Sequence, residues 1–223
     1  MPTITATNDG NINANLQEGF GGSWDGVRDA TSGGVASSQT STNTGVARIV
    51  VFSFGGSTRW IIHRSFYEFD TSGISIAPSA ATLKIFGAGS GTTDVIAVKG
   101  TQSDSLTSAD YDNLDFSTAY SAEVASWNAS GYNDFSLNAA ALQDMVDNDS
   151  LKVAVISHDF DYLDVDPGDP TVSFNLGGFY SEADAENRPH IDYTAGVIDA
   201  VIFTEIKSIG GNIDIKSGTL TIK

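Results

Sequence analysis

The stretch of the chain most suggestive of chemistry is an acidic run, "HDFDYLDVDPGDPT", over residues 158–171. Its five aspartates fall within eleven residues, beside a Pro-Gly turn: Asp159, Asp161, Asp164, Asp166 and Asp169. Carboxylate oxygens are the ligands that Ca²⁺ prefers, so the run could fold around one calcium ion. The spacing does not match the EF-hand pattern, and the alternative, which we favour, is a solvated acidic loop.

Two further segments carry residue types suited to binding sugars. A pyranose ring stacks on an aromatic face, and nearby amides and carboxylates then fix its hydroxyls. Trp24 and Asp25 lie in "GGSWDG", whereas Tyr132, Asn133 and Asp134 lie in "SGYND". Because glycine marks both segments as loops, these five residues are the predicted carbohydrate contacts. For Trp24, anchoring its own loop is the alternative.

Motifs of catalysis are missing from the sequence. It contains neither G-x-S-x-G, nor H-E-x-x-H, nor G-x-x-x-x-G-K-[ST]. The three histidines, His63, His158 and His190, lie in or beside predicted strands without a local partner signature. A pair of carboxylates could still act as a glycosidase, since their separation cannot be read from sequence. We expect a protein that is not an enzyme.

Charge and composition exclude several partners. The chain has 28 acidic and 11 basic residues, for a formal net charge of -17, so it repels phosphate backbones and anionic membranes. Nucleic acid and membrane are therefore not expected as partners. Without cysteine, the chain forms no disulfide and no thiolate metal site. The first residues lack the basic and apolar regions of a signal peptide, which predicts that the chain has none.

The apolar periodicity is that of β-strands. Residues 60–70 carry large side chains on both faces of an alternating run, which is typical of a central strand. Further strands are predicted at 48–54, 80–87, 94–98, 151–157, 171–176 and 190–194. One short helix is predicted, capped by Asn138, with Leu142, Met145 and Val146 on one face. The predicted fold is an all-β antiparallel sandwich or jelly roll with one short helix.

Five segments follow one another in an informative order: "RSFYEFDTSGISIAPSAATLKIFG", Trp127, "FSLNAAALQDM", "LKVAVISHDFD" and "FYSEADAENRPHIDY". This order resembles the DNRLRE domains, jelly-roll modules related to a carbohydrate-binding-module family and common in phage structural proteins. The likeness spans residues 4–195. Its most specific positions are Arg64, Phe69, Asp70, the "SAATL" strand, Ser181, Glu182, Arg188, Pro189 and Tyr193. The resemblance implies a jelly-roll domain over residues 1–195.

Arg64 lies within the apolar central run. A covered arginine needs a carboxylate or carbonyl groups, because an unpaired buried charge is costly. We therefore expect Arg64 to form a structural ion pair, with Asp70 or Glu182 as its partner, in preference to binding a ligand.

The last 28 residues, 196–223, differ from the domain before them. They hold three acids and three lysines, so the whole net charge lies on residues 1–195. Their alternation around "KSG" predicts a C-terminal β-hairpin with one apolar face. The apolar residues of this tail are Ile206, Ile213, Ile215, Leu220 and Ile222. Because such a hairpin is rarely stable alone, it should dock on another chain or on its own domain. We expect contacts with another chain, so that the tail anchors the domain in an assembly.

These observations together predict a virion surface protein, such as a phage decoration, fibre or tail module, outside the cell after release. Its expected partners are other subunits, in a homo-oligomer joined through the tail, and host or environmental glycans. One alternative is a carbohydrate-binding module of a secreted polysaccharide-degrading or adhesive protein. The other is a subunit of an extracellular filament that donates its tail as a strand.

Overall fold

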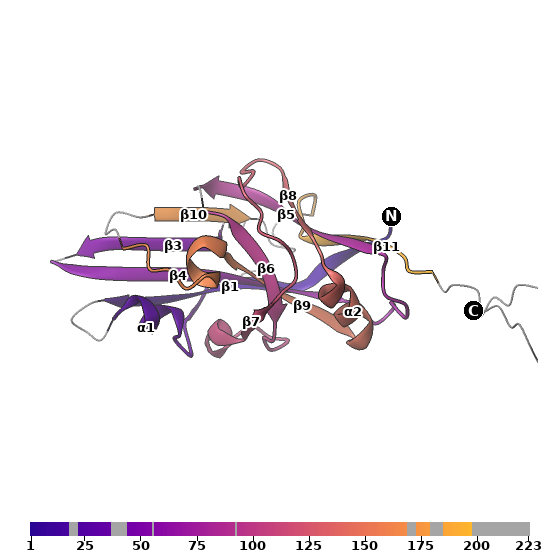
Figure 1. Cartoon of the computed structure of the whole chain (residues 1–223), viewed down its shortest axis with the longest axis horizontal. Helices are drawn as coiled ribbons and strands as arrows, with labels where there is room; N and C mark the ends of the chain where they lie inside the picture. Colours follow the sequence, from indigo (N-terminus) through magenta and orange to yellow (C-terminus); the bar gives the residue numbers. More distant parts are fainter. Residues whose placement is uncertain are drawn as a thin grey trace, which may run out of the picture.

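The computed structural model of this chain describes residues 1–17, 22–36, 44–54, 56–91, 93–168, 173–178 and 185–197, and Figure 1 shows their arrangement. This part of the chain is mostly antiparallel β-sheet. The strands are β1 (Thr3–Gln17), β2 (Gly34–Ala36), β3 (Thr44–Phe54), β4 (Ser57–Asp70), β5 (Ala80–Ser90), β6 (Val95–Gly100), β7 (Leu114–Ala119), β8 (Tyr132–Ser136), β9 (Ser150–Ser157), β10 (Ser173–Gly178) and β11 (His190–Thr194). The helical segments are α1 (Trp24–Arg28), α2 (Ala139–Asp147), the 3₁₀ turn η1 (Ser108–Asp112) and the π-helical turn η2 (His158–Tyr162).

Strand β4 is the centre of the longer sheet. It pairs with β1 along one edge, and with β3 and then β9 along the other. Beyond these, β10 joins β3, and β6 and β7 follow β9. The prediction of a central strand at residues 60–70 is confirmed.

Two strands pass from the longer sheet to a smaller one. Residues 3–5 of β1 pair with β11, and from Ala6 onward the strand pairs with β4, with a register shift between Ala6 and Asn8. Strand β5 pairs with β11 and β8, and its last residues pair with β10. The pairings therefore close a circuit through β1, β4, β3, β10, β5 and β11, which leaves none of these strands as a free edge.

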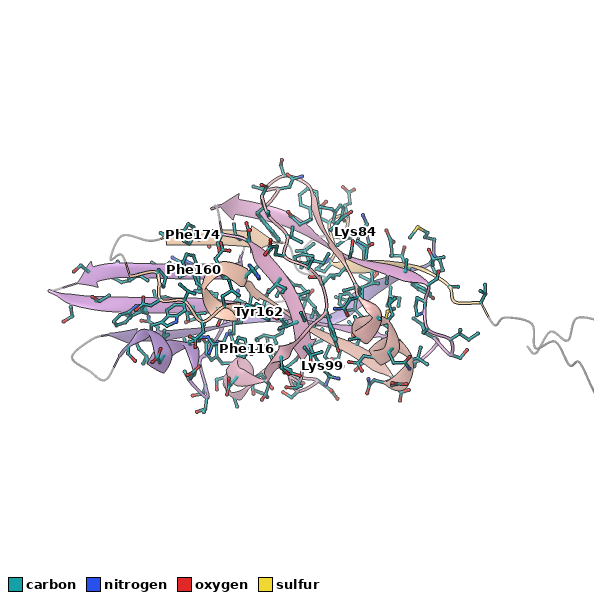
Figure 2. The ribbon with its side chains drawn as sticks, in the orientation of Figure 1. Lys84, Lys99, Phe116, Phe160, Tyr162 and Phe174 are labelled. Atoms are coloured by element: carbon teal, nitrogen blue, oxygen red, sulfur yellow. The ribbon has the colours of Figure 1, made fainter. Side chains whose placement is uncertain are left out.

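Both faces of β4 are buried, each in a different core. Tyr67 and Phe69 face the first core, which lies between the two sheets. Ile62 and Phe66 face a second core on the opposite side of the longer sheet. Trp24 and Val27 of α1 and Tyr111 of η1 contribute to this second core. At its far end Phe160 stacks on Phe174, with ring centroids 5.4 Å apart (Figure 2).

The predicted helix is confirmed as α2. The Asn138 side chain accepts hydrogen bonds from the backbone of Ala140 and Ala141, and Met145 is buried in the first core. A second helix, α1, was not predicted. Its cap is Ser23, whose hydroxyl accepts a hydrogen bond from the Gly26 amide.

The all-β sandwich is thus confirmed, while the predicted tail hairpin lies outside the described residues except for Gly196 and Val197. No helix in the described ranges is long and apolar enough to cross a membrane.

Candidate functional site

A buried ion pair between Arg64 and Asp161 lies in the second core. The Arg64 Nε and Nη2 atoms donate to the two carboxylate oxygens of Asp161, each at 2.8 Å. Arg64 is therefore a structural residue, as expected. Of the two partners that were expected for it, Asp70 is wrong, and Glu182 is not tested. Asp70 is exposed and accepts hydrogen bonds from Ser72, and Glu182 lies outside the described residues.

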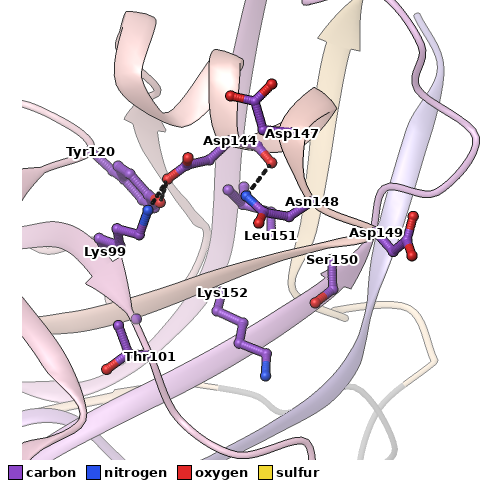
Figure 3. A pocket seen from close by; sticks show the side chains of 11 residues that line it. Lys99, Thr101, Tyr120, Asp144, Asp147, Asn148, Asp149, Ser150, Leu151 and Lys152 are labelled. Carbon is purple, nitrogen blue, oxygen red and sulfur yellow. Dashed lines mark hydrogen bonds and ion pairs between the residues drawn. The ribbon is translucent and has the colours of Figure 1, made fainter.

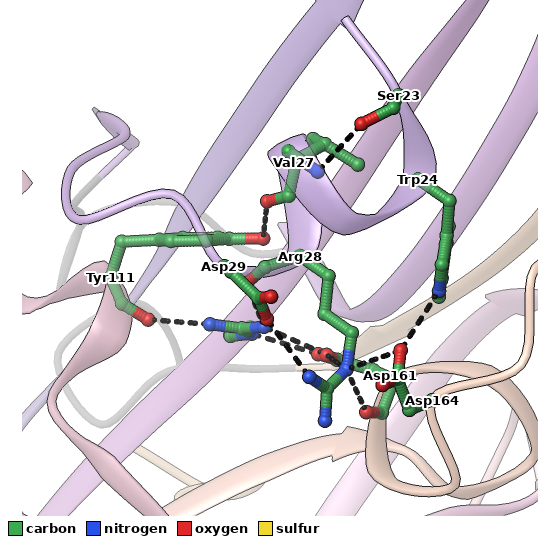
Figure 4. Close-up of polar contacts among 10 residues, drawn as sticks. Ser23, Trp24, Val27, Arg28, Asp29, Tyr111, Asp161 and Asp164 are labelled. Atoms are coloured by element: carbon green, nitrogen blue, oxygen red, sulfur yellow. Dashed lines mark hydrogen bonds and ion pairs between the residues drawn. The ribbon is translucent and has the colours of Figure 1, made fainter.

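The remaining bonds of this ion pair reach two other segments. Arg64 Nη1 donates to the Tyr111 carbonyl at 3.0 Å, and Nη2 donates to the Arg28 carbonyl at 2.7 Å. The guanidinium also lies over the Tyr111 ring, 4.1 Å from its centroid. Figure 4 shows Arg28, Tyr111 and Asp161 converging from α1, η1 and η2. We call Arg28, Arg64, Tyr111 and Asp161 the arginine cluster.

Arg28 extends the arginine cluster toward the surface. Its Nε donates to the Asp161 carbonyl at 2.9 Å, and its Nη1 pairs with Asp29 at 2.9 Å. Burial by itself would lower the pKa of Arg64, but the charge of Asp161 outweighs it, so the pKa is raised above its ordinary value. Arg64 therefore stays charged, and the ion pair joins β4 to the three segments that cover the second core.

The aspartates of the acidic run have separate partners. Both carboxylate oxygens of Asp161 are bound to Arg64, and an oxygen of Asp164 lies 3.3 Å from both Trp24 Nε1 and Arg28 Nε. Asp166 accepts from the Gly168 amide, and Asp169 lies outside the described residues. Within the described ranges no three carboxylate or imidazole groups come together as a metal site requires. The four described aspartates of the run, Asp159, Asp161, Asp164 and Asp166, are not gathered around one point.

Asp159 belongs to a different cluster, beside His158. It accepts hydrogen bonds from the Asp94 amide at 3.0 Å and from the Thr93 hydroxyl at 3.2 Å. His158 Nδ1 lies 3.1 Å from a Glu123 oxygen and 3.5 Å from Asp159. Burial, and then the charges of Asp159 and Glu123, raise the pKa of Asp94. A protonated His158 would offset this repulsion.

Trp24 is not the exposed sugar platform that its loop predicted. The side chain is 4% exposed, because the cap at Ser23 starts a helix that turns the indole into the second core. Asp25 remains exposed on the outer side of this helix. The alternative for Trp24, that it anchors its own segment, is what the structure shows.

Tyr132, Asn133 and Asp134 lie in strand β8 and not in a loop. The Tyr132 ring is half-buried and makes edge contacts with Phe86 at 5.2 Å and His190 at 5.0 Å. Asn133 is buried and binds the backbone around Asn128, so it is structural. Asp134 pairs with Lys84 of the neighbouring strand at 3.0 Å. Only Tyr132 and Asp134 of this set remain on the outer face of the smaller sheet.

A polar hollow lies where α2 meets the start of β9. Its volume is about 590 Å³ (Figure 3). Its lining is mostly polar: Lys99, Gly100, Thr101, Tyr120, Asp144, Asp147, Asn148, Asp149, Ser150, Leu151 and Lys152. Lys99 donates to Asp144 at 2.7 Å, and the Tyr120 hydroxyl donates to the same oxygen.

Asp144 is the central carboxylate of this polar hollow. Burial opposes ionisation of Asp144, but hydrogen bonds from Lys99 and Tyr120 outweigh it and lower the pKa of the carboxyl. An aspartate held ionised by two donors is a poor general base. The exposed carboxylates of Asp147 and Asp149 could accept hydrogen bonds from ligand hydroxyls or amines. No local sequence pattern indicates the hollow, because its residues come from three separate segments.

His63 lies on β4, in a row with Arg48 of β3. Burial, and then the charge of Arg48, lower the pKa of the imidazole to about 4. His63 is therefore neutral at pH 7.

The predicted assembly residues of the tail, from Ile206 to Ile222, lie outside the described residues. No family model matches the chain, and no curated protein matches it. The fold and the sites define an antiparallel β-sandwich with a second core, a buried ion pair and a polar hollow.

The arginine cluster generates a stability prediction. Asp161→Asn leaves the Arg64 charge buried without a counter-charge, which should lower the free energy of unfolding by about 3–5 kcal/mol. Urea denaturation at pH 7 measures this loss. Asp166→Asn is the matched control, since Asp166 is exposed, and should change stability by less than about 0.5 kcal/mol. Equal effects of the two substitutions would contradict a structural role for the cluster.

His63 generates a pH prediction. Its folded-state pKa is about 4, below the ordinary value of 6.5, so the unfolded state binds more protons between these values. Stability contributed by the neutral imidazole is present above pH 6.5 and is lost as pH falls, by about 2 kcal/mol at pH 5. His63→Asn should lose less stability than the wild type between pH 7 and pH 5, in parallel urea denaturations. If the two proteins lose the same amount, His63 does not carry this depressed pKa.

Proposed function

We propose that this chain is a non-enzymatic structural module displayed on a virion surface, as phage decoration, fibre or tail modules are, and attached to other subunits through residues 196–223. The observation that supports this proposal best is the range of residues that build the two described cores. Both are built from residues between Ile4 and Tyr193, and β11 fills the place between β1 and β5. The tail thus follows a domain whose sheets are already closed. The resemblance to DNRLRE domains supports the same assignment.

The charge distribution fits a displayed domain. Several of its basic side chains are in ion pairs, such as Lys84 with Asp134, Lys99 with Asp144 and Lys152 with Asp104. The excess of acids leaves the domain strongly negative, which keeps copies of it apart unless a specific contact joins them. The near-neutral tail is suited to supply that contact. A secreted carbohydrate-binding module and a filament subunit remain alternatives, and they differ in what the tail joins.

The test is deletion of residues 198–223. The cut keeps Gly196, whose Cα packs closely on the Ala77 carbonyl, so the end of the domain is undisturbed. The shortened chain should keep the urea midpoint of the full chain and should run as a monomer in light scattering, while the full chain forms oligomers. A full-length Ile213→Asp, Ile215→Asp variant is the matched control and should behave like the deletion, since it removes only the apolar face.

Two outcomes would contradict this assignment. If the shortened chain unfolds, the tail belongs to the domain. If it still assembles as the full chain does, the tail is dispensable for assembly.

Glycan binding is a second candidate function, favoured by the partly exposed Tyr132 ring beside Asp134 and Lys84 on the smaller sheet. A ring with neighbouring charged groups is the combination that sugar recognition uses. The polar hollow at α2 offers hydroxyl and carboxylate partners but no exposed aromatic face, because Tyr120 is 1% exposed.

A glycan array separates these roles. Tyr132→Ala should abolish any glycan signal of the full chain while α2 and the cores stay folded, as judged by circular dichroism. Trp24→Ala should instead cost about 3–5 kcal/mol of stability, because it empties part of the second core. An array without signal for the wild type, or an unchanged signal for Tyr132→Ala, would remove the sugar role of this residue.

A further inference from the structure

A row of polar side chains crosses four strands of the longer sheet. The register places Asn13 of β1 opposite His63 of β4, His63 opposite Arg48 of β3, and Arg48 opposite Asn175 of β10. Residues paired in this way project from the same face of a sheet, with Cβ atoms about 4.5–5.5 Å apart. Asn13, His63 and Arg48 are half-buried, and Asn175 is exposed. The row is therefore partly open to solvent.

Two nitrogen atoms in the middle of this row lack partners. Arg48 Nε and His63 Nδ1 are both covered and make no hydrogen bond. A covered polar atom without a partner is costly, so it needs an explanation such as a bound ion. Arg28 and Arg64, by contrast, are bound to carboxylates. Among the described residues, no ion pair neutralises Arg48 in the same way.

Among the described residues, the nearest same-face positions along these four strands carry no acidic side chain. The positions before and after it on the same face are all uncharged: Asn11, Ser65 and Val46 on one side, and Asn15, Ile61, Val50 and Ser173 on the other. This is unusual in a chain of net charge -17. An acidic side chain at one of these positions would neutralise Arg48 and repel an anion. The row offers a positive charge, a neutral imidazole and two amides.

We propose that Arg48 and His63 form an anion-binding site, flanked by the amides of Asn13 and Asn175, for a small oxyanion or the oxyanion group of a larger ligand. An oxyanion between the two side chains accepts from the guanidinium and the imidazole together, and charge-assisted bonds of this kind are the stronger ones. Because His63 is neutral at pH 7, it donates through one ring nitrogen while Arg48 supplies the charge. Asn13 and Asn175 can donate to further oxygens. The site is independent of the proposed virion assembly.

The test is a titration followed by histidine side-chain nuclear magnetic resonance at pH 7 and constant ionic strength. The chain has three histidines, so His63 is resolved from His158 and His190, which lie beside carboxylates. Inorganic phosphate, sulfate and acetate are the probes, and together they distinguish tetrahedral from planar anions. We expect the His63 signal to move saturably with at least one probe, at a dissociation constant of about 1 mM or tighter, while the other two signals stay in place.

Variants identify the side chains responsible. Arg48→Gln should weaken binding at least about tenfold. Arg59→Gln is the matched control, since Arg59 is bound to Asn15 on the same face, and should bind as the wild type does. If Arg48→Gln does not fold, Arg48→Lys keeps the charge, loses the guanidinium fork and should still bind more weakly. No saturable shift of His63 with any probe, or unchanged affinity in the Arg48 variant, overturns the proposal.

Discussion

The ion pair between Arg64 and Asp161 is the interaction on which the second core depends. Burying two charges is costly, and the cost is offset here because both carboxylate oxygens and two backbone carbonyls bind the guanidinium. Those contacts come from three segments, α1, η1 and η2, each too short to be stable alone. The pair therefore holds a cover of short turns on a sheet that would otherwise expose the apolar side chains of Ile62 and Phe66 to water.

This arrangement determines where function can lie. Between Arg64 and Tyr67 both faces of β4 are buried, whereas the polar row at His63 and Arg48 is partly open. Among the described residues, the outer face of the smaller sheet and the hollow at α2 are two further places with accessible polar side chains. The described strands already pair in a closed circuit, which supports the proposal that residues 196–223 attach the domain to a neighbour.

Elements that depend on neighbouring residues in the sequence, such as strand β4 and helix α2, are predictable from the sequence. Strand β4 was recognised from its alternation, and α2 from the cap at Asn138 and its apolar spacing. For Trp24 the glycines indicated a loop and left a sugar contact and an anchoring role open; Ser23 instead caps a helix that buries the indole, so the anchoring role is the one observed. The partner of Arg64 was beyond sequence reasoning, since Asp161 lies 97 positions away and only the packing of η2 on β4 brings them together. The partners of Asp159, Asp161 and Asp164 in the acidic run are likewise distant in sequence, so the run alone could not reveal them.

The claim that the ion pair holds the cover on the sheet is tested most directly by native-state hydrogen exchange of Asp161→Asn against the wild type. The account predicts that amides of α1 and η1 lose protection first and most, while those of β5 and β8, which face the first core, keep theirs. Unchanged protection in α1 and η1, or a uniform loss across all strands, would contradict it.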